Sequence, residues 1–562
     1  MKIRFTSKSI LLILVILLVF VINVYPMLVM LLKSMQGPQG LTLQYFIDVF
    51  ADSRNIEAIR NTFVVAAAST CLSIILGAGL AYLIGRSDLP GRSFLKVLIV
   101  IPFFTPSFVY AMAWQQLFNP AGYFNKLYMA ILGGGEPLFS IYGPLGIILV
   151  MTAVGSATVF LITEGAFRQM DRAMEEAALV CGAKPVKVLK DITMPIMLPN
   201  ILAAAVIVFI TGISNFGIPA VLGFQVSYYV LTTRIYQVLH EFYRGNSFEA
   251  ASAMSILLLV LAILSLWLKD RTIKQGRHVV QTGKGCQLRV KLGLLKTPLF
   301  LLAALLLIFS SIMPLIAIVL TSLTKAYGLA PWPSNLTLAN FVQLTELSLV
   351  KRAFMNTLAL SVAAATIAAA VGTVIAYILI RTNWKIKSWL DVAAATPYTI
   401  PATIVALAMI LAFSQPLPLL GISLYNTIWI ILVAYVARYM FFVIRTVSAA
   451  MSQVSPSFEE AARISGANWL KSVKDVLLPQ IQKSILLSWI LVFTHTISEL
   501  ALSIMLWSAG NETIAVAVFN LQETGNLTTA SALAVFLLVV SVGCYLISEY
   551  LRQTPKSPKS DL

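Results

Sequence analysis

The stretch EEAALVCGA at residues 175–183 occurs a second time, as EEAARISGA at residues 459–467. In both copies Glu-Ala-Ala is followed by three residues, a glycine, nine residues and a tetrapeptide that ends in proline, ITMP at 192–195 and VLLP at 476–479. Acidic residues suit the start of a helix, alanines leave a small-residue face, and glycine permits the positive φ that reverses a chain. We therefore predict, in each copy, a short helix, a glycine turn and a second short helix that ends at the proline.

Both copies belong to a chain whose composition is that of a membrane protein. Of its 562 residues, 59% are hydrophobic and only 11% are charged, whereas soluble domains are about 25% charged. Residues 10–32 carry no charge, and roughly 20 apolar residues in a helix cross a hydrocarbon core. This run is longer than the apolar region of a cleaved signal peptide, so we expect a retained membrane span.

Apolar stretches predict twelve membrane-spanning helices, near residues 10–32, 59–84, 95–117, 144–166, 199–222, 250–268, 298–321, 355–380, 391–413, 426–446, 484–506 and 528–550. Thirty of the 40 Lys and Arg residues fall in alternating segments between these spans: 1–9, 85–96, 167–198, 269–297, 381–387, 445–483 and 552–562. The positive-inside rule assigns these segments, and with them both termini, to the cytoplasm. The net charge of +17 is therefore explained by membrane topology, and no nucleic-acid partner is expected.

Further repeats divide the chain into two halves. Residues that recur at an offset of 295 are Asn61-Thr62, Arg86, Pro102 and Pro106, which return as Asn356-Thr357, Arg381, Pro397 and Pro401. Repeats in one order along the chain imply two parallel six-helix halves. We expect an all-α polytopic membrane protein with a first half at 1–268, a cytoplasmic linker at 269–297 and a second half at 298–562. The two copies of the opening motif then lie in cytoplasmic loops at 167–198 and 447–480.

These loops resemble the EAA motif of ATP-binding-cassette (ABC) importer permeases, with Met194 and Val476 as mild departures from its pattern. The resemblance implies that each loop docks into a groove on one of two copies of an ATPase subunit. It assigns the contact to Glu176, Ala177, Ala178 and Gly182 in the first half and to Glu460, Ala461, Ala462 and Gly466 in the second. The preceding Glu175 and Glu459 are expected to pair with basic residues of the ATPase.

The chain lacks the residues that would hydrolyse ATP by itself. No G-x-x-x-x-G-K-[ST] motif occurs, so a phosphate-cradling loop is missing. Three histidines and four scattered cysteines indicate no metal centre, disulfide framework or cofactor site. We therefore expect a transport subunit and not an enzyme. The resemblance also implies a periplasmic or lipid-anchored substrate-binding protein and a location in the bacterial inner membrane.

Polar side chains inside spans are costly and usually functional. In the fifth span of the second half these are His495, Ser498 and Glu499, and Asn215 is equivalent to Glu499 at an offset of 284. We predict that these four residues line the transport pathway, with Asn215 and Glu499 facing each other.

The substrate is less constrained by the residues. The stretch at 498–521 resembles ferric-iron permeases, which favours ferric iron. Permeases for 2-aminoethylphosphonate and for thiamine belong to the same branch and remain alternatives. A secondary transporter driven by an ion gradient is an alternative of another class, since it also uses parallel repeats but has no use for docking loops.

Overall fold

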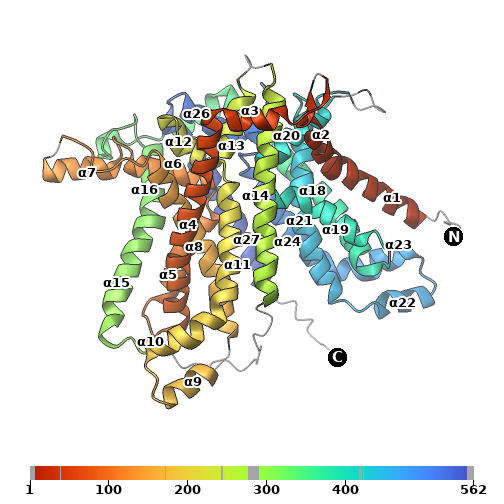
Figure 1. Ribbon diagram of the computed structural model, residues 1–562, viewed down its shortest axis with the longest axis horizontal. Helices are drawn as coiled ribbons and strands as arrows, with labels where there is room; N and C mark the ends of the chain where they lie inside the picture. Colours follow the sequence, from red (N-terminus) through yellow and green to blue (C-terminus); the bar gives the residue numbers. More distant parts are fainter. Residues whose placement is uncertain are drawn as a thin grey trace. The chain divides into compact units, whose positions relative to one another are not determined.

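The computed structural model describes residues 7–37, 39–133, 135–170, 173–241, 245–275, 290–416, 421 and 423–553 (Figure 1). Among these residues, ten helices are long and apolar enough to cross a membrane, or twelve if each of two bent helix pairs counts as one span. The prediction of an all-α membrane protein with about twelve spans is confirmed. Residues 276–289 of the expected linker lie outside the described residues.

In the first half the spans are α1 with α2 (Ser7–Val19, Tyr25–Lys33), α4 (Ser53–Arg86), α5 with α6 (Arg92–Phe104, Ser107–Phe118), α8 (Pro144–Gln169), α11 (Met194–Ile213) and α14 (Ser247–Gln275). In the second half they are α15 with α16 (Lys296–Leu307, Met313–Ser322), α18 (Ser348–Arg381), α19 with α20 (Lys387–Thr399, Ala402–Phe413), α21 (Ile428–Ser452), α24 (Leu478–Ile497) and α27 (Leu527–Gln553). Smaller elements between them include β1 (Gln36–Gly37), β2 (Gly40–Leu41), α3 (Gln44–Ala51), α7 (Tyr123–Leu132) and α17 (Ala339–Glu346).

The third span of each half is broken rather than merely kinked. Helices α5 and α6 meet at 110°, and so do α19 and α20. Pro106 and Pro401 each stand immediately before the second helix of the pair. Since proline has no N–H and its ring clashes with the preceding helical turn, the chain cannot continue straight through these positions. The chain therefore makes a large turn within the third span of each half.

The fifth span of each half ends earlier than the apolar pattern predicts. Helix α11 ends at Ile213 and is followed by the short helices α12 (Gly217–Gly223) and α13 (Leu231–Leu239). Helix α24 ends at Ile497 and is followed by α25 (Ser503–Leu506) and α26 (Ile514–Glu523). Hydropathy did not detect these breaks because α12 and α25, which directly follow the breaks, are themselves apolar.

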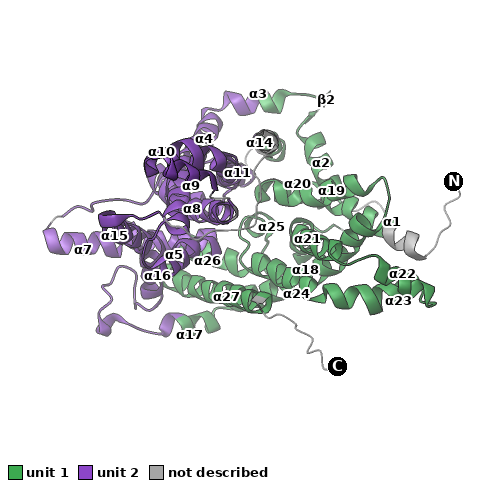
Figure 2. Cartoon of the chain, turned by 90° about the horizontal axis from the view of Figure 1, so that it is seen from below, with its two compact units in different colours: residues 1–46, 241–255, 341–562 green, residues 47–240, 256–340 purple. Residues whose placement is uncertain are grey.

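The chain packs into two compact units that exchange the first span of each half (Figure 2). Unit 1 comprises residues 1–46, 241–255 and 341–562, and unit 2 comprises residues 47–240 and 256–340. Helices α1 and α2 thus pack with the second half, where Asn23 donates a hydrogen bond of 3.0 Å to the carbonyl of Ala393. Helices α15 and α16 pack with the first half, where Tyr110 donates a hydrogen bond of 2.5 Å to the carbonyl of Ser310.

The exchanged helix α15 is also tied to the loop that follows α4. Asp88 accepts hydrogen bonds from the backbone N–H of Leu292 at 3.0 Å and from Nζ of Lys296 at 3.3 Å. The Leu292 N–H and the Lys296 ammonium hold the pKa of Asp88 below its usual value. The start of α15 is therefore fixed to the first half by a charged contact outside the spans.

Small residues at every fourth position let α4 and α18 approach their neighbours closely. The buried sets are Ser69, Ser73, Gly77 and Ala81 in α4 and Ala364, Ala368, Gly372 and Ala376 in α18. Such stripes allow helix backbones to pack in contact within a membrane. A Cβ added to Gly77 would lie 2.7 Å from Cβ of Val159 in α8, and one added to Gly372 would lie 2.8 Å from Cβ of Val443 in α21.

Gly77→Ala is expected to destabilise the protein by about 1–3 kcal/mol, because the new methyl group overpacks the α4–α8 contact. Gly79→Ala is the matched control on the same helix, since its Cβ would meet no atom within 4 Å. The measurement is thermal unfolding of the detergent-solubilised protein, followed by tryptophan fluorescence. Equal unfolding temperatures for the two variants would contradict the close packing at Gly77.

Candidate coupling elbows and intramembrane polar residues

Both copies of the opening motif fold as a helix, a glycine turn and a second helix. We call residues 173–195 the first elbow and residues 457–479 the second elbow. The first contains α9 (Ala173–Val180) and α10 (Pro185–Val188), and the second contains α22 (Ser457–Ile464) and α23 (Trp469–Ser472). In unit 2, α9 and α10 lie at one end of the membrane-spanning helices, and α6 and α12 lie at the other end (Figure 1).

The glycine and the second alanine of each motif form one hydrogen-bonded helix end. Gly182 has φ of 85° and Gly466 has φ of 89°. The N–H of the alanine after each glycine bonds back to the carbonyl of Ala178 at 2.9 Å or of Ala462 at 3.0 Å. The glycine N–H bonds to the next carbonyl, at 3.0 Å in both elbows. This is the Schellman pattern, in which a residue with positive φ satisfies the last carbonyls of a helix.

The proline of each elbow does not end a helix, contrary to our prediction. Helix α10 continues through a π-helical turn at Leu189–Thr193 into α11, so one continuous helix runs from Pro185 to Ile213. The second elbow has the same turn at Val473–Leu477. The wider π-turn precedes Pro195 and Pro479, where it absorbs the missing N–H and relieves the ring clash. Each elbow is therefore continuous with the following membrane helix.

Glu175 and Glu459, which we expected to reach a partner's basic residues, are instead paired within the chain. Glu459 accepts a hydrogen bond of 2.8 Å from Nε of Arg381, and the two side chains are only 8% and 9% exposed. Glu175 lies 3.3 Å from Nη2 of Arg86 and accepts a hydrogen bond of 2.5 Å from Oγ1 of Thr193. These carboxylates fix the elbows to the ends of α18 and α4.

The remaining motif residues differ in their exposure. Ala177, Glu460 and Ala461 are exposed, and so are both glycines, whereas Glu176, Ala178 and Ala462 are half-buried. The exposed residues present a surface to a partner. Their contact with a partner stays a prediction.

Three pairs of apolar residues on the elbows were not singled out by the motif. At equivalent positions, offset by 284, the structure exposes Met174 and Phe458, Val180 and Ile464, and Val186 and Leu470. Val180 and Ile464 are each 88% exposed. Their signal in the sequence is that both copies keep an apolar residue at the same place in a loop rich in charged residues.

Glu499 and Asn215 perform the same local task in the two halves. The Asn215 side chain accepts a hydrogen bond of 3.0 Å from the N–H of Ile218, and Glu499 accepts one of 2.9 Å from the N–H of Leu502. In each case the acceptor satisfies a backbone N–H at the start of the short helix that follows the broken fifth span. The two residues lie in different units, and their facing each other across a pathway stays a prediction.

Around Glu499 the structure gathers polar and aromatic groups that the sequence analysis did not group together. Tyr439 donates a hydrogen bond to Glu499, and its ring lies 5.8 Å from the ring of His495. Arg438 donates to the carbonyls of Pro397 at 2.7 Å and Ile400 at 2.8 Å, which the break between α19 and α20 leaves without helical partners. The equivalent first-half positions hold Val154, Gly155 and Thr211. This polar cluster therefore belongs to the second half alone.

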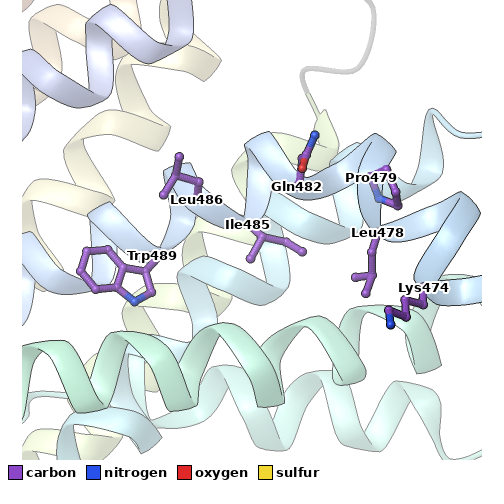
Figure 3. Close-up of a pocket in the computed structure, with 7 residues that line it drawn as sticks. All are labelled: Lys474, Leu478, Pro479, Gln482, Ile485, Leu486 and Trp489. Atoms are coloured by element: carbon purple, nitrogen blue, oxygen red, sulfur yellow. The ribbon is translucent and has the colours of Figure 1, made fainter. Parts of the chain in front are cut away.

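The other proposed pathway residues have local partners. His495 Nδ1 is 2.8 Å from the carbonyl of Leu491, and the Ser498 hydroxyl donates to the carbonyl of Thr494 at 3.2 Å. A separate cavity of about 650 Å³ follows the outer face of α24 from the second elbow to Trp489 (Figure 3). It includes Lys474 and Gln482 but none of the four residues proposed for the pathway.

Comparison with known proteins gives the sequence two matches to one family. The family is described as binding-protein-dependent transport system inner membrane component, and it matches residues 73–274 and 368–556. The probable ABC transporter permease protein y4fN of Sinorhizobium fredii is 26% identical over 95% of this chain and 94% of its own length. The ferric transport system permease protein FbpB of Actinobacillus pleuropneumoniae is 23% identical over 96% of this chain and 77% of its own length. A putative 2-aminoethylphosphonate transport system permease protein, PhnV of Salmonella paratyphi A, is 28% identical over 43% of this chain and 88% of its own length.

Gly466→Ala is expected to loosen the second elbow, because a side chain at positive φ costs about 1–2 kcal/mol. Local opening then becomes roughly tenfold more frequent, since 1.4 kcal/mol is a factor of ten. Limited trypsin digestion measures this at Arg463 and Lys471, which flank the turn. The control is Gly165→Ala in α8, whose Cβ would meet no atom within 4 Å and whose φ is not positive. Unchanged cleavage in Gly466→Ala would show that the turn does not depend on glycine.

Proposed function

The chain belongs to the family of binding-protein-dependent transport system inner membrane components, and we propose from this premise that it imports ferric iron by ATP-driven alternating access. It is an ABC importer permease in which two membrane halves are fused in one chain. Two copies of a separate ATPase bind its elbows from the cytoplasm. With twelve spans, both termini lie on the same cytoplasmic side as the elbows. A periplasmic or lipid-anchored binding protein delivers the substrate from the other side.

The observation that carries this proposal is the duplication of the elbow. Glycine φ, helix-end hydrogen bonds and the π-turn agree between two segments that are 284 residues apart. A loop that only connected two spans would tolerate drift between the copies, whereas docking onto two identical subunits requires the same shape twice. An ion-gradient transporter has no use for such a pair.

The exposed apolar residues supply the chemistry of docking. Val180 and Ile464, each 88% exposed, stand at the ends of α9 and α22, next to the glycine turn. Exposed apolar side chains that cluster on a charged surface are typical of protein contact sites. We propose that Val180 and Ile464 form the centre of the contact with the ATPase. Glu176 and Glu460 form the polar rim of this contact.

Ferric iron is the preferred substrate because the FbpB relative aligns along both halves of this chain. The PhnV relative aligns with less than half of it, which makes 2-aminoethylphosphonate the second candidate. The polar cluster around Glu499 is the part of the membrane domain that we assign to the pathway, together with Ser498 and Asn215.

Val180→Asp combined with Ile464→Asp is expected to reduce co-purification of the ATPase by about tenfold or more, since a buried charge replaces an apolar contact on each side. The measurement is the yield of tagged ATPase pulled down with the chain. The matched control is Leu41→Asp, which changes a residue that is 80% exposed outside the elbows. Full recovery of the ATPase by the double variant would contradict the assignment of the docking surface.

Uptake into proteoliposomes tests the function and the substrate together. With the ATPase and the binding protein present, ATP should drive uptake of radioactive ferric iron, and ATP withdrawal should stop it. If the proteoliposomes took up 2-aminoethylphosphonate and not iron, 2-aminoethylphosphonate would be the substrate and the iron proposal would be wrong. Transport by the chain alone, driven by an ion gradient, would overturn the importer proposal.

A further inference from the structure

Helices α4 and α18 are the longest helices of the two halves, and each is held by side chains at two separated points. Both have 34 residues. The points are Asn61-Thr62 and Arg86 in α4, and Asn356-Thr357 and Arg381 in α18. In both helices the threonine and the arginine are 24 residues apart, which corresponds to about 36 Å along a helix. This length exceeds a hydrocarbon core of about 30 Å.

The inner point of each helix is its ion pair with an elbow. Arg381 donates to Glu459 from Nε at 2.8 Å and to the carbonyl of Val454 from Nη2 at 2.7 Å. In the first half, Arg86 Nη2 lies 3.3 Å from the equivalent Glu175. A buried pair is costly to separate, because either charge alone would be left in a poorly solvated place. When an elbow moves, the end of α4 or α18 that is paired with it must therefore move as well.

The outer point holds the chain just beyond the broken fifth span. Thr62 Oγ1 accepts the N–H of Leu231 at 2.7 Å, and Thr357 Oγ1 accepts the N–H of Ile514 at 2.8 Å. Leu231 and Ile514 are the first residues of α13 and α26. Their N–H groups have no partner within their own helices, so the threonines cap these helices from a different helix.

The neighbouring asparagines reinforce the same connection. Asn61 donates to the carbonyl of Tyr229 at 3.0 Å, and Asn356 donates to the carbonyls of Gly510 and Glu512, both at 3.0 Å. In the first half the connection continues inward, because Thr232 donates to the carbonyl of Asn215 at 2.8 Å. The outer point is thus bonded to the segment that carries a proposed pathway residue.

We propose that α4 and α18 act as connecting rods, which transmit movement of each elbow to the segment that follows the broken fifth span. Thr62, Thr357, Arg86 and Arg381 are positioning residues in this scheme. A continuous helix is stiff along its axis, and close packing on α8 or α21 keeps it straight. The proposal rests on the proposed function for its role in transport, but the mechanical connection is a property of the chain alone.

Hydrogen exchange of the full chain in detergent tests the connection without any partner. Thr357→Val removes the acceptor at the outer point, and Glu459→Gln weakens the ion pair at the inner point. Each variant is expected to raise exchange at its own end and also at the other end, in peptides covering 455–470 and 508–516. A remote increase of about fivefold is the lower end of usual coupling between sites.

Two variants serve as controls. Thr357→Ser keeps the hydroxyl and is expected to restore slow exchange at both ends. Thr373→Val makes the same change on the same helix at a hydroxyl that has no hydrogen-bond partner among the described residues, and it should leave both peptides unchanged. If Glu459→Gln does not fold, Glu175→Gln provides the inner-end measurement, with peptides covering 228–236, because Glu175 is 16% exposed and Glu459 only 8%. If every variant raised hydrogen exchange only at the mutated end, the proposal that α4 and α18 are connecting rods would be overturned.

The transport consequence is measured in the complex with the ATPase. Thr62→Val combined with Thr357→Val should raise the number of ATP molecules consumed per substrate imported, while ATPase co-purification stays at the wild-type level. An unchanged ratio would overturn the role of the rods in coupling. Failure of the wild-type complex to import with ATP would instead overturn the proposed function, and the exchange measurement would still decide whether the two ends are connected.

Discussion

The structure depends on one constraint: within a bilayer, every backbone N–H and C=O group needs a partner from the protein. Both halves break their third and fifth spans, and each break exposes such groups. Arg438 bonds to the carbonyls of Pro397 and Ile400, and Glu499 and Asn215 accept the N–H groups of Leu502 and Ile218. The polar residues inside the spans are thus required first for the fold, and any role in a pathway builds on that.

The duplicated elements divide into two elbows of similar design and a membrane interior that differs between the halves. The elbows agree in φ, hydrogen bonds and exposed apolar residues. The interior does not, since Arg438 and Tyr439 have Val154 and Gly155 as counterparts. Under the proposed function, two copies of one ATPase require two similar docking sites, whereas one substrate requires only one set of polar contacts. This asymmetry supports the proposed assignment of the pathway to the polar cluster around Glu499.

Exchange of the first spans gives the fused chain a second kind of connection between its halves. Asn23 of α1–α2 bonds within unit 1, and Ser310 of α15–α16 bonds within unit 2. Each unit therefore combines segments from both halves of the sequence. Division of the sequence at the linker stays a prediction for the repeat, and the packed units follow different boundaries.

The sequence by itself determined the membrane class, the spans and the elbows, because hydropathy, positive charge and a glycine at a fixed spacing are local signals. It placed Gly182 and Gly466 at chain reversals, and φ at both is positive. Only the tertiary structure decided which groups meet. Glu175 and Glu459 turn inward to Arg86 and Arg381, the elbow prolines continue a helix through a π-turn, and Thr62 and Thr357 cap other helices. The ion pairs and the threonine caps depend on contacts between residues far apart in the chain, which no local pattern records.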